Sequence, residues 1–121
     1  MTTVLLVEDN HMNARLVKYV LERDDFDLIL ATTAEEAMQM AAEHRPDIIL
    51  MDIQLPGMDG LEATRRLKLD PQTRDIPVVA VTAHAMRGDE ERILAAGCRG
   101  YISKPINTRE LGKTVTKFAA G

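Results

Sequence analysis

Five polar side chains of this sequence stand at or directly after the ends of short apolar runs: Glu8, Asp9, Asp52, Thr82 and Lys104. A carboxylate in such a place is costly to bury unless a positive charge or hydrogen bonds compensate it. Three carboxylates held together would also raise one another's pKa values, and a hard divalent cation relieves that repulsion. Because the set offers oxygen ligands and neither Cys nor His, it favours Mg²⁺, which keeps several waters and accepts a phosphate oxygen.

Lys104 supplies a second positive charge for the same place. A metal ion and a lysine on either side of one carboxylate leave a position for a phosphoryl group. Asp52 can then act as a nucleophile and form an aspartyl-phosphate, with catalysis resting on positioning and charge neutralisation. This chemistry requires the five side chains to converge, so it depends on the elements that carry them.

Short apolar runs alternate with amphipathic stretches along the whole chain. The runs are typical of strands buried on both faces of a parallel sheet, and they are Val4–Val7, Leu28–Ala31, Ile48–Met51, Val78–Val81 and Gly100–Ser103. Each run is followed by a helical pattern. The first of these has an apolar stripe made of Leu16, Val17, Val20 and Leu21.

The helical patterns have recognisable ends. Thr33 and Asp59 are typical N-caps, each with a Glu three residues later that completes a capping box. The fourth helix is expected to run through Glu90–Ala96 and to stop at Gly97, a natural residue for a helix end. The fifth is expected to start at Asn107.

Five strand–helix units predict an α/β fold, a doubly wound five-stranded parallel sheet with helices on both faces. Right-handed crossovers leave few topologies, of which the flavodoxin-like order 2-1-3-4-5 is the commonest for five strands. In that order the carboxyl ends of strands one, three, four and five are neighbours. Taken singly, Glu8 and Asp9 are also typical of helix caps, Thr82 of a strand and Lys104 of a turn. Their joint occurrence at four strand ends favours a site.

The whole chain sets further bounds. Its 121 residues fit one domain, residues 1–121. A net charge of −4 without a basic block argues against direct nucleic-acid binding. The sequence has no stretch that would insert into a membrane and no signal peptide. The single Cys98 cannot form an internal disulfide, which suits a cytoplasmic protein, and we expect it to be a small buried hydrophobe.

Four stretches together resemble the receiver domain of response regulators in two-component signalling: LLVEDN, MDIQLPGMDG, VVAVTAHAM and GYISKPI, in this order. The resemblance covers essentially the whole chain. It implies a phosphorylation-switched signalling module with Asp52 as phosphoacceptor and Mg²⁺ as cofactor. The phosphoryl donor would be a histidine kinase or a histidine phosphotransfer protein. The resemblance implies that the module is not an enzyme, although it catalyses its own phosphoryl transfer and a slow autodephosphorylation.

The resemblance also implies a set of metal ligands. Asp9 and Asp52 would bind Mg²⁺ directly, together with the backbone carbonyl of Gln54. Glu8 would act mainly through a bound water. Gln54 and His84 would flank the phosphoryl group and influence its hydrolysis, although for His84 an ordinary loop histidine is an equal interpretation.

Further roles follow for the phosphoryl group and the switch. Lys104 would pair with one phosphoryl oxygen, and the Thr82 hydroxyl would bind another with help from the N–H of Ala83. Tyr101 would be the aromatic switch that turns inward when Thr82 moves, its alternative being half-buried packing. The Lys104–Pro105 peptide bond would be cis.

We expect the output surface to be the face of the fourth helix, the fifth strand and the fifth helix, with Met86 a candidate contact. The chain ends at Gly121, just after the last predicted helix. This favours a stand-alone regulator that acts through protein–protein contact, and a receiver domain excised from a hybrid histidine kinase is the alternative. A Mg²⁺-dependent phosphatase-like enzyme is disfavoured, because Gln54 stands where a haloacid dehalogenase would have its second acid.

Overall fold

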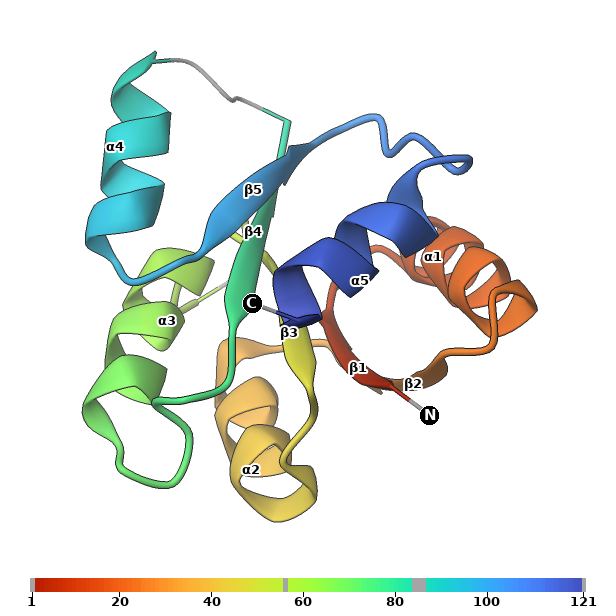
Figure 1. Cartoon of the computed structure of the whole chain (residues 1–121). Helices are drawn as coiled ribbons and strands as arrows, with labels where there is room; N and C mark the ends of the chain where they lie inside the picture. Colours follow the sequence, from red (N-terminus) through yellow and green to blue (C-terminus); the bar gives the residue numbers. More distant parts are fainter. Residues whose placement is uncertain (1, 56, 84–86, 121) are drawn as a thin grey trace.

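The structure is a computed structural model that describes residues 2–55, 57–83 and 87–120. Strands and helices alternate along the chain (Figure 1). They are β1 (Thr3–Val7), α1 (His11–Arg23), β2 (Asp27–Ala31), α2 (Ala34–His44), β3 (Ile48–Asp52), α3 (Gly60–Leu69), β4 (Val78–Thr82), α4 (Arg87–Ala95), β5 (Gly100–Ser103) and α5 (Leu111–Ala120). The strands are parallel and lie in the order β2-β1-β3-β4-β5. The fold class and strand order predicted from the sequence are confirmed.

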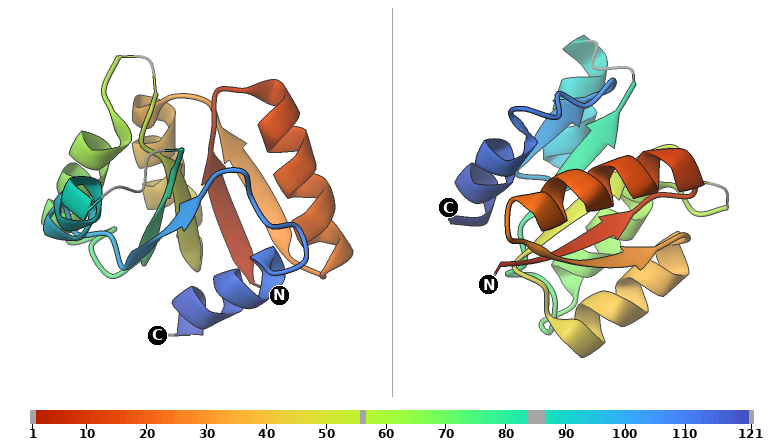
Figure 2. Two further views of the ribbon diagram at one scale, coloured as in Figure 1. Left: turned by 90° about the horizontal axis from the view of Figure 1, so that it is seen from above. Right: turned by 90° about the vertical axis from the view of Figure 1, so that its right-hand side faces the viewer.

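The sheet separates two apolar cores, because successive side chains of a strand point to opposite faces. Leu5 and Ile49 pack with α2, α3 and α4 on one face. Their neighbours Leu6 and Leu50 pack with α1 and α5 on the other. Figure 2 shows the helices on both sides of the sheet. β3 and β4 are buried throughout, which is why their sequences are continuously apolar.

The edge strand β2 differs from the prediction. Its run was expected to be buried on both faces, yet Leu30 is 37% exposed. β2 pairs only with β1, so less of the molecule covers it. Within the described ranges, no helix combines the length and apolarity needed to cross a membrane.

The helix caps follow the sequence with small differences. The side chains of Thr33 and Asp59 accept hydrogen bonds from the N–H groups three residues on, at 3.1 and 2.8 Å, as predicted. The carboxylate of Glu36, however, accepts from the N–H of Thr32 at 2.8 Å and not from that of Thr33. Gly97 has a φ of 108°, as expected for a residue after a helix.

The last two helices begin elsewhere than predicted. α4 starts at Arg87, three residues before the expected Glu90. Asn107 caps a turn at 108–110, where its side chain accepts from the N–H groups of Arg109 and Glu110 at 3.0 and 3.3 Å. α5 itself starts only at Leu111.

One residue of the predicted α1 stripe lies outside the core. Val17, Val20 and Leu21 are buried, whereas Leu16 is 45% exposed. Ala14 is buried instead. The buried face of α1 therefore consists of Ala14, Val17, Val20 and Leu21, and Leu16 lies beside it. Leu16 is therefore available at the surface of α1.

Gly60, the first residue of α3, lies against the strand that carries Asp52. A Cβ at this position would collide with the backbone carbonyl of Asp52 and approach the Cα of Ile53 at 2.8 Å. At Gly112 of α5 the corresponding atom would meet only the side chain of Asp24, which is exposed. The same substitution thus meets rigid backbone at one site and a movable carboxylate at the other.

We predict that Gly60→Ala destabilises the fold by about 1–3 kcal/mol, since the backbone of β3 must shift to admit the methyl group. Gly112→Ala should stay within about 1 kcal/mol of the wild type or gain stability, because Ala favours a helix and Asp24 can move. Urea unfolding of both variants measures the two effects. Equal effects of the two substitutions would contradict the close approach at Gly60.

Candidate functional site

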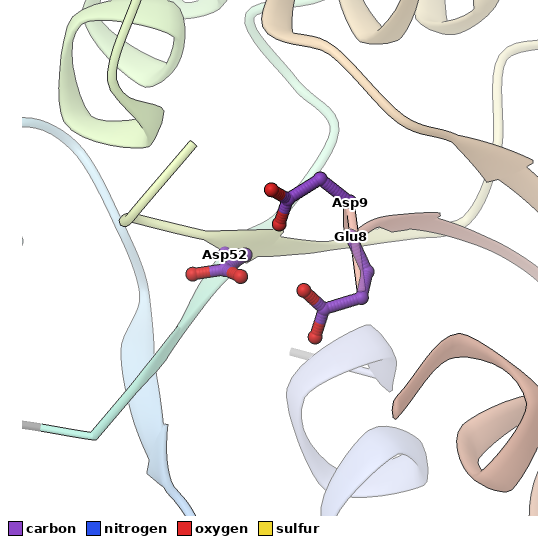
Figure 3. Close-up of side chains that lie close together, drawn as sticks. All are labelled: Glu8, Asp9 and Asp52. Carbon is purple, nitrogen blue, oxygen red and sulfur yellow. The ribbon is translucent and has the colours of Figure 1, made fainter. Parts of the chain in front are cut away.

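The predicted polar side chains meet at one edge of the sheet. β1, β3 and β4 are parallel neighbours, so Glu8, Asp9, Asp52 and Thr82 all lie where strands end. One carboxylate oxygen from each of the three acids lies within 4.8 Å of the other two (Figure 3). Glu8 and Asp9 come from the end of β1, and Asp52 points toward them from β3.

Burial distinguishes the three acids. Glu8 and Asp52 are each only 3% exposed, whereas Asp9 is exposed. The ammonium of Lys104 lies 3.2 Å from Oδ2 of Asp52 and 3.4 Å from Oε1 of Glu8. One lysine therefore faces two buried carboxylates, and a third carboxylate remains open to solvent.

Three acids against one lysine leave an excess of negative charge at this edge. The donor set consists of oxygen atoms, and the exposed Asp9 offers one from the solvent side. This composition fits a hard divalent cation such as Mg²⁺, which takes a few carboxylates and keeps part of its water shell. Glu8, Asp9 and Asp52 are the residues that could hold it.

Backbone groups hold the buried carboxylates in place. The N–H of Gln54 donates to Oδ1 of Asp52 at 2.9 Å, and the N–H of Asn10 donates to Oε2 of Glu8 at 3.4 Å. Asn10 is also the N-cap of α1, since its side chain accepts from the N–H groups of Met12 and Asn13. The reading of Glu8 and Asp9 as caps is therefore wrong.

The environment shifts the pKa values of Glu8 and Lys104. Burial raises the pKa of Glu8 to about 7, helped by a hydrogen bond to Asp52 and by the charge of that carboxylate. Lys104 and the N–H of Asn10 act in the opposite direction but do not cancel the shift. Burial by itself lowers the pKa of Lys104, yet the charges of Asp52 and Glu8 outweigh it and raise this pKa above its ordinary value. Lys104 is thus held in its charged form.

The raised pKa of Glu8 predicts a dependence of stability on pH. In metal-free buffer the folded chain keeps a proton on Glu8 between about pH 4.5 and 7 that the unfolded chain has lost. The free energy of unfolding should therefore fall as pH rises through this window, by roughly 1.4 kcal/mol for each pKa unit. Glu8→Gln should lack this contribution, which urea unfolding of both proteins across the window measures. Parallel curves would argue against a raised pKa.

Thr82 and Tyr101 lie on the neighbouring strands. Thr82 ends β4, is 1% exposed and pairs with Ser103 of β5. Ala83 follows it and is exposed. Tyr101 pairs with Ala80 and is partly buried, packed against the core on the α2, α3 and α4 face. Its position is compatible with the switch and with the simpler packing interpretation.

Other predicted features have mixed outcomes. The Lys104–Pro105 bond is cis, as predicted. Cys98 is buried, with its Sγ 3.9 Å from the hydroxyl of Thr64. Gln54 is exposed beside Asp52. His84 lies outside the described residues.

Asn10 and Gly60 contribute to the site but were not singled out from the sequence. Asn10 had a usable signal, because Asn before an amphipathic pattern is a common N-cap. The sequence signal for Gly60 was weaker, namely a glycine directly after the capping residue Asp59. The close approach of Gly60 to Asp52 becomes visible only in three dimensions.

Comparison with known proteins agrees with this architecture. The family model of the response regulator receiver domain matches residues 4–116, and the chain belongs to this family. It is 49% identical over 116 residues to the polar-differentiation response regulator DivK of Brucella anthropi, a match that covers 96% of this chain and 94% of DivK. The fold is therefore that of a response regulator receiver domain.

Solved structures agree. The receiver domain of a sensor histidine kinase from Pseudomonas aeruginosa, with a magnesium ion coordinated in its active-site cleft, is 34% identical with a TM-score of 0.91, and the match covers 99% of this chain and 98% of that one. A receiver domain of a Saccharomyces cerevisiae response regulator, crystallised with a histidine phosphotransfer protein, is 29% identical with a TM-score of 0.88. That match covers 98% of this chain and 89% of the other.

Proposed function

We propose that residues 1–121 form one receiver domain that accepts a phosphoryl group from a phosphohistidine donor onto Asp52, with Mg²⁺, and signals by protein–protein contact. The observation that carries the proposal is the convergence of Lys104, Glu8 and Asp9 around Asp52. The match to DivK covers 94% of that regulator and supports a stand-alone role. We place the protein in the cytoplasm, which suits its single unpaired cysteine.

The contacts of Asp52 suit a nucleophile. The N–H of Gln54 holds Oδ1, while Oδ2 faces the ammonium of Lys104. A carboxylate oxygen would attack phosphorus, the bond from phosphorus to the donor imidazole would break, and the histidine would leave with the electron pair. Lys104 would then neutralise a phosphoryl oxygen.

The metal would be held by Asp9, Asp52 and the backbone carbonyl of Gln54, with Glu8 acting through a water. Bound there, Mg²⁺ would neutralise the charge that the acids and the phosphoryl oxygens bring together. The same residues explain why an accessible Asp9 stands next to a buried Glu8: the first can reach a cation from solvent, while the second helps to hold Lys104.

Asp52→Asn should abolish phosphorylation, because an amide lacks the nucleophilic carboxylate oxygen while keeping the shape of the side chain. Incubation with acetyl phosphate and Mg²⁺ should add one phosphoryl group to the wild type and none to the variant, as read by intact mass. Asp59→Asn is the matched control, since Asn also caps a helix well and should leave phosphorylation unchanged. A phosphorylated Asp52→Asn protein would refute the assignment.

The surface next to the site supports a protein as phosphoryl donor. Met12, Leu16 and Tyr19 form a row on α1 and are 81%, 45% and 68% exposed. Leu16 and Lys104 line a common small cavity together with Ile106. Large exposed apolar side chains in a row mark a contact for another protein.

Leu16→Glu should slow phosphotransfer from a histidine phosphotransfer protein by about tenfold or more, because it places a charge in the apolar contact. Phosphorylation by acetyl phosphate should be unaffected, since a small donor does not need that surface. Leu69→Glu is the control, at an 82% exposed leucine on α3. If phosphorylation by both donors slowed equally, Leu16 would act in the phosphoryl transfer itself and not in docking of the donor protein.

We further propose that phosphorylation alters the face formed by α4, β5 and α5. The Thr82 hydroxyl and the N–H of Ala83 would bind phosphoryl oxygens, and movement of Thr82 would admit the Tyr101 ring. A groove of about 350 Å³ lined by Tyr101, Glu110 and Thr114 opens on this face. Met86, predicted as a contact here, lies outside the described residues.

Beryllofluoride, a mimic of the phosphoryl group, should shift the amide signals of Tyr101 and of α4 and α5 as well as those near Asp52. The reason is that a local two-state element biased by added charge carries the change outward. Amide-resolved spectra with and without the mimic measure this. Shifts confined to the surroundings of Asp52 would show that Tyr101 is ordinary packing.

A further inference from the structure

A separate cleft lies between α5 and the end of α1, which are side by side in Figure 1. Its volume is about 600 Å³. It is lined by four cations, one acid and one aromatic ring, namely Arg23, Arg109, Lys113, Lys117, Asp24 and Phe26. None of these residues belongs to the acidic edge, so the cleft is not part of the phosphorylation site.

The charge of the cleft opposes that of the whole chain. The protein has a net charge of −4, yet cations outnumber acids here by four to one. Asp24, the one acid of the lining, lies 3.4 Å from Arg23 and so already has a cation beside it. Across residues 2–55, 57–83 and 87–120, no salt bridge involves Arg109, Lys113 or Lys117, all three of which are exposed. The cleft therefore presents unneutralised positive charge.

The three cations of this flank stand in a row. Lys113 and Lys117 are one turn apart on α5, and Arg109 precedes them by the same spacing in the turn before the helix. Four residues of helix correspond to a rise of about 6 Å, so a helix that carries one acid per turn would present its charges at a matching interval. The partly buried ring of Phe26 adds apolar surface beside the cations, and the carboxylate of Asp24 lies over Gly112.

We propose that this cleft docks an acidic amphipathic helix of a partner protein, with carboxylates against Arg109, Lys113 and Lys117 and apolar side chains over Phe26. Thr114, on the other flank of α5, and Glu110, just before the helix, line the groove beside Tyr101. The two flanks of α5 thus serve different contacts, and this partner can stay bound while the α4, β5 and α5 face is occupied.

Other occupants fit less well. A nucleic acid would bring many phosphates toward a protein whose net charge is −4. A small anion would be better held by converging, buried donors, whereas these cations are exposed and spread along the helix. A row of cations beside the Phe26 ring matches an acidic amphipathic helix in both charge and apolar contact.

The test uses the full chain and a labelled synthetic helical peptide with one Glu per turn on one face and Leu beside it. A second peptide carries Gln in place of each Glu. Fluorescence anisotropy gives the affinities, and amide-resolved spectra locate the binding. We expect the Glu peptide to bind, to shift signals of α5 and of Phe26, and to bind more weakly as salt is added.

Two charge-matched variants test the location. Arg109→Gln with Lys113→Gln should weaken binding about tenfold, since each removes one contact with a carboxylate. Arg65→Gln with Arg66→Gln removes the same charge from α3, where both arginines are exposed, and should leave binding unchanged. Phosphorylation by acetyl phosphate should persist in both, which shows that they fold. Equal weakening in the two variants, or equal binding of the Gln peptide, would overturn the proposal.

Three further outcomes would also overturn it in favour of another occupant. An oligonucleotide that binds more tightly than the Glu peptide and depends on Arg109 and Lys113 would indicate nucleic acid. Inorganic phosphate that shifts the same amides at the same concentration would indicate a small-anion site. Self-association in sedimentation that is lost in Arg109→Gln with Lys113→Gln would indicate a second copy of this chain.

Discussion

The contact of one ammonium with two buried carboxylates is the constraint on which this molecule depends. Glu8 and Asp52 lie at the end of a core from which water is largely excluded, and neither could remain there as a charged group without compensation. Lys104, at 3.2 and 3.4 Å, provides most of it. The compensation is incomplete, as the raised pKa of Glu8 shows. The remaining negative charge favours the binding of a cation here, and a bound cation in turn favours a phosphoryl group.

The parallel sheet is the structure that brings these charges together. Glu8 and Lys104 are far apart in the sequence and meet because parallel strands end at the same edge. The apolar runs before them anchor the backbone, so the side chains are carried by rigid elements and not by long loops. Gly60 completes the arrangement, since only a residue without Cβ allows α3 to start against the carbonyl of Asp52.

Much of this arrangement is predictable from the sequence, for a physical reason. Buried strands such as β3 are continuously apolar, and the parallel order then places Asp52 beside Glu8, Asp9 and Lys104 without any knowledge of distances. Burial is harder to predict: nothing in the adjacent pair Glu8 and Asp9 says that the first is buried and the second exposed. The exposure of Leu30 depends on the edge position of its strand.

Features made by separate segments escape such reasoning. The cationic cleft joins Arg23 to Arg109 through the packing of α1 on α5, and a sequence that is acidic overall gives no indication of it. Leu16 was assigned to the core because it continues the apolar stripe of α1. Val20, one turn further on, is buried, and the sequence does not show that the buried surface ends between the two.

The division of the interior into two cores has a consequence for how such a protein can change. Because the sheet lies between them, the side chains packed with α1 and α5 and those packed with α2, α3 and α4 form two separate clusters. Substitutions deep inside the two clusters should be nearly additive, whereas the α4, β5 and α5 face spans both halves and couples them. The contacts that the α1 and α5 side makes with partner proteins can therefore change between related regulators, while the packing of the opposite half stays the same. A change of partner on the α1 and α5 side then requires substitutions in one of the two cores and not in both.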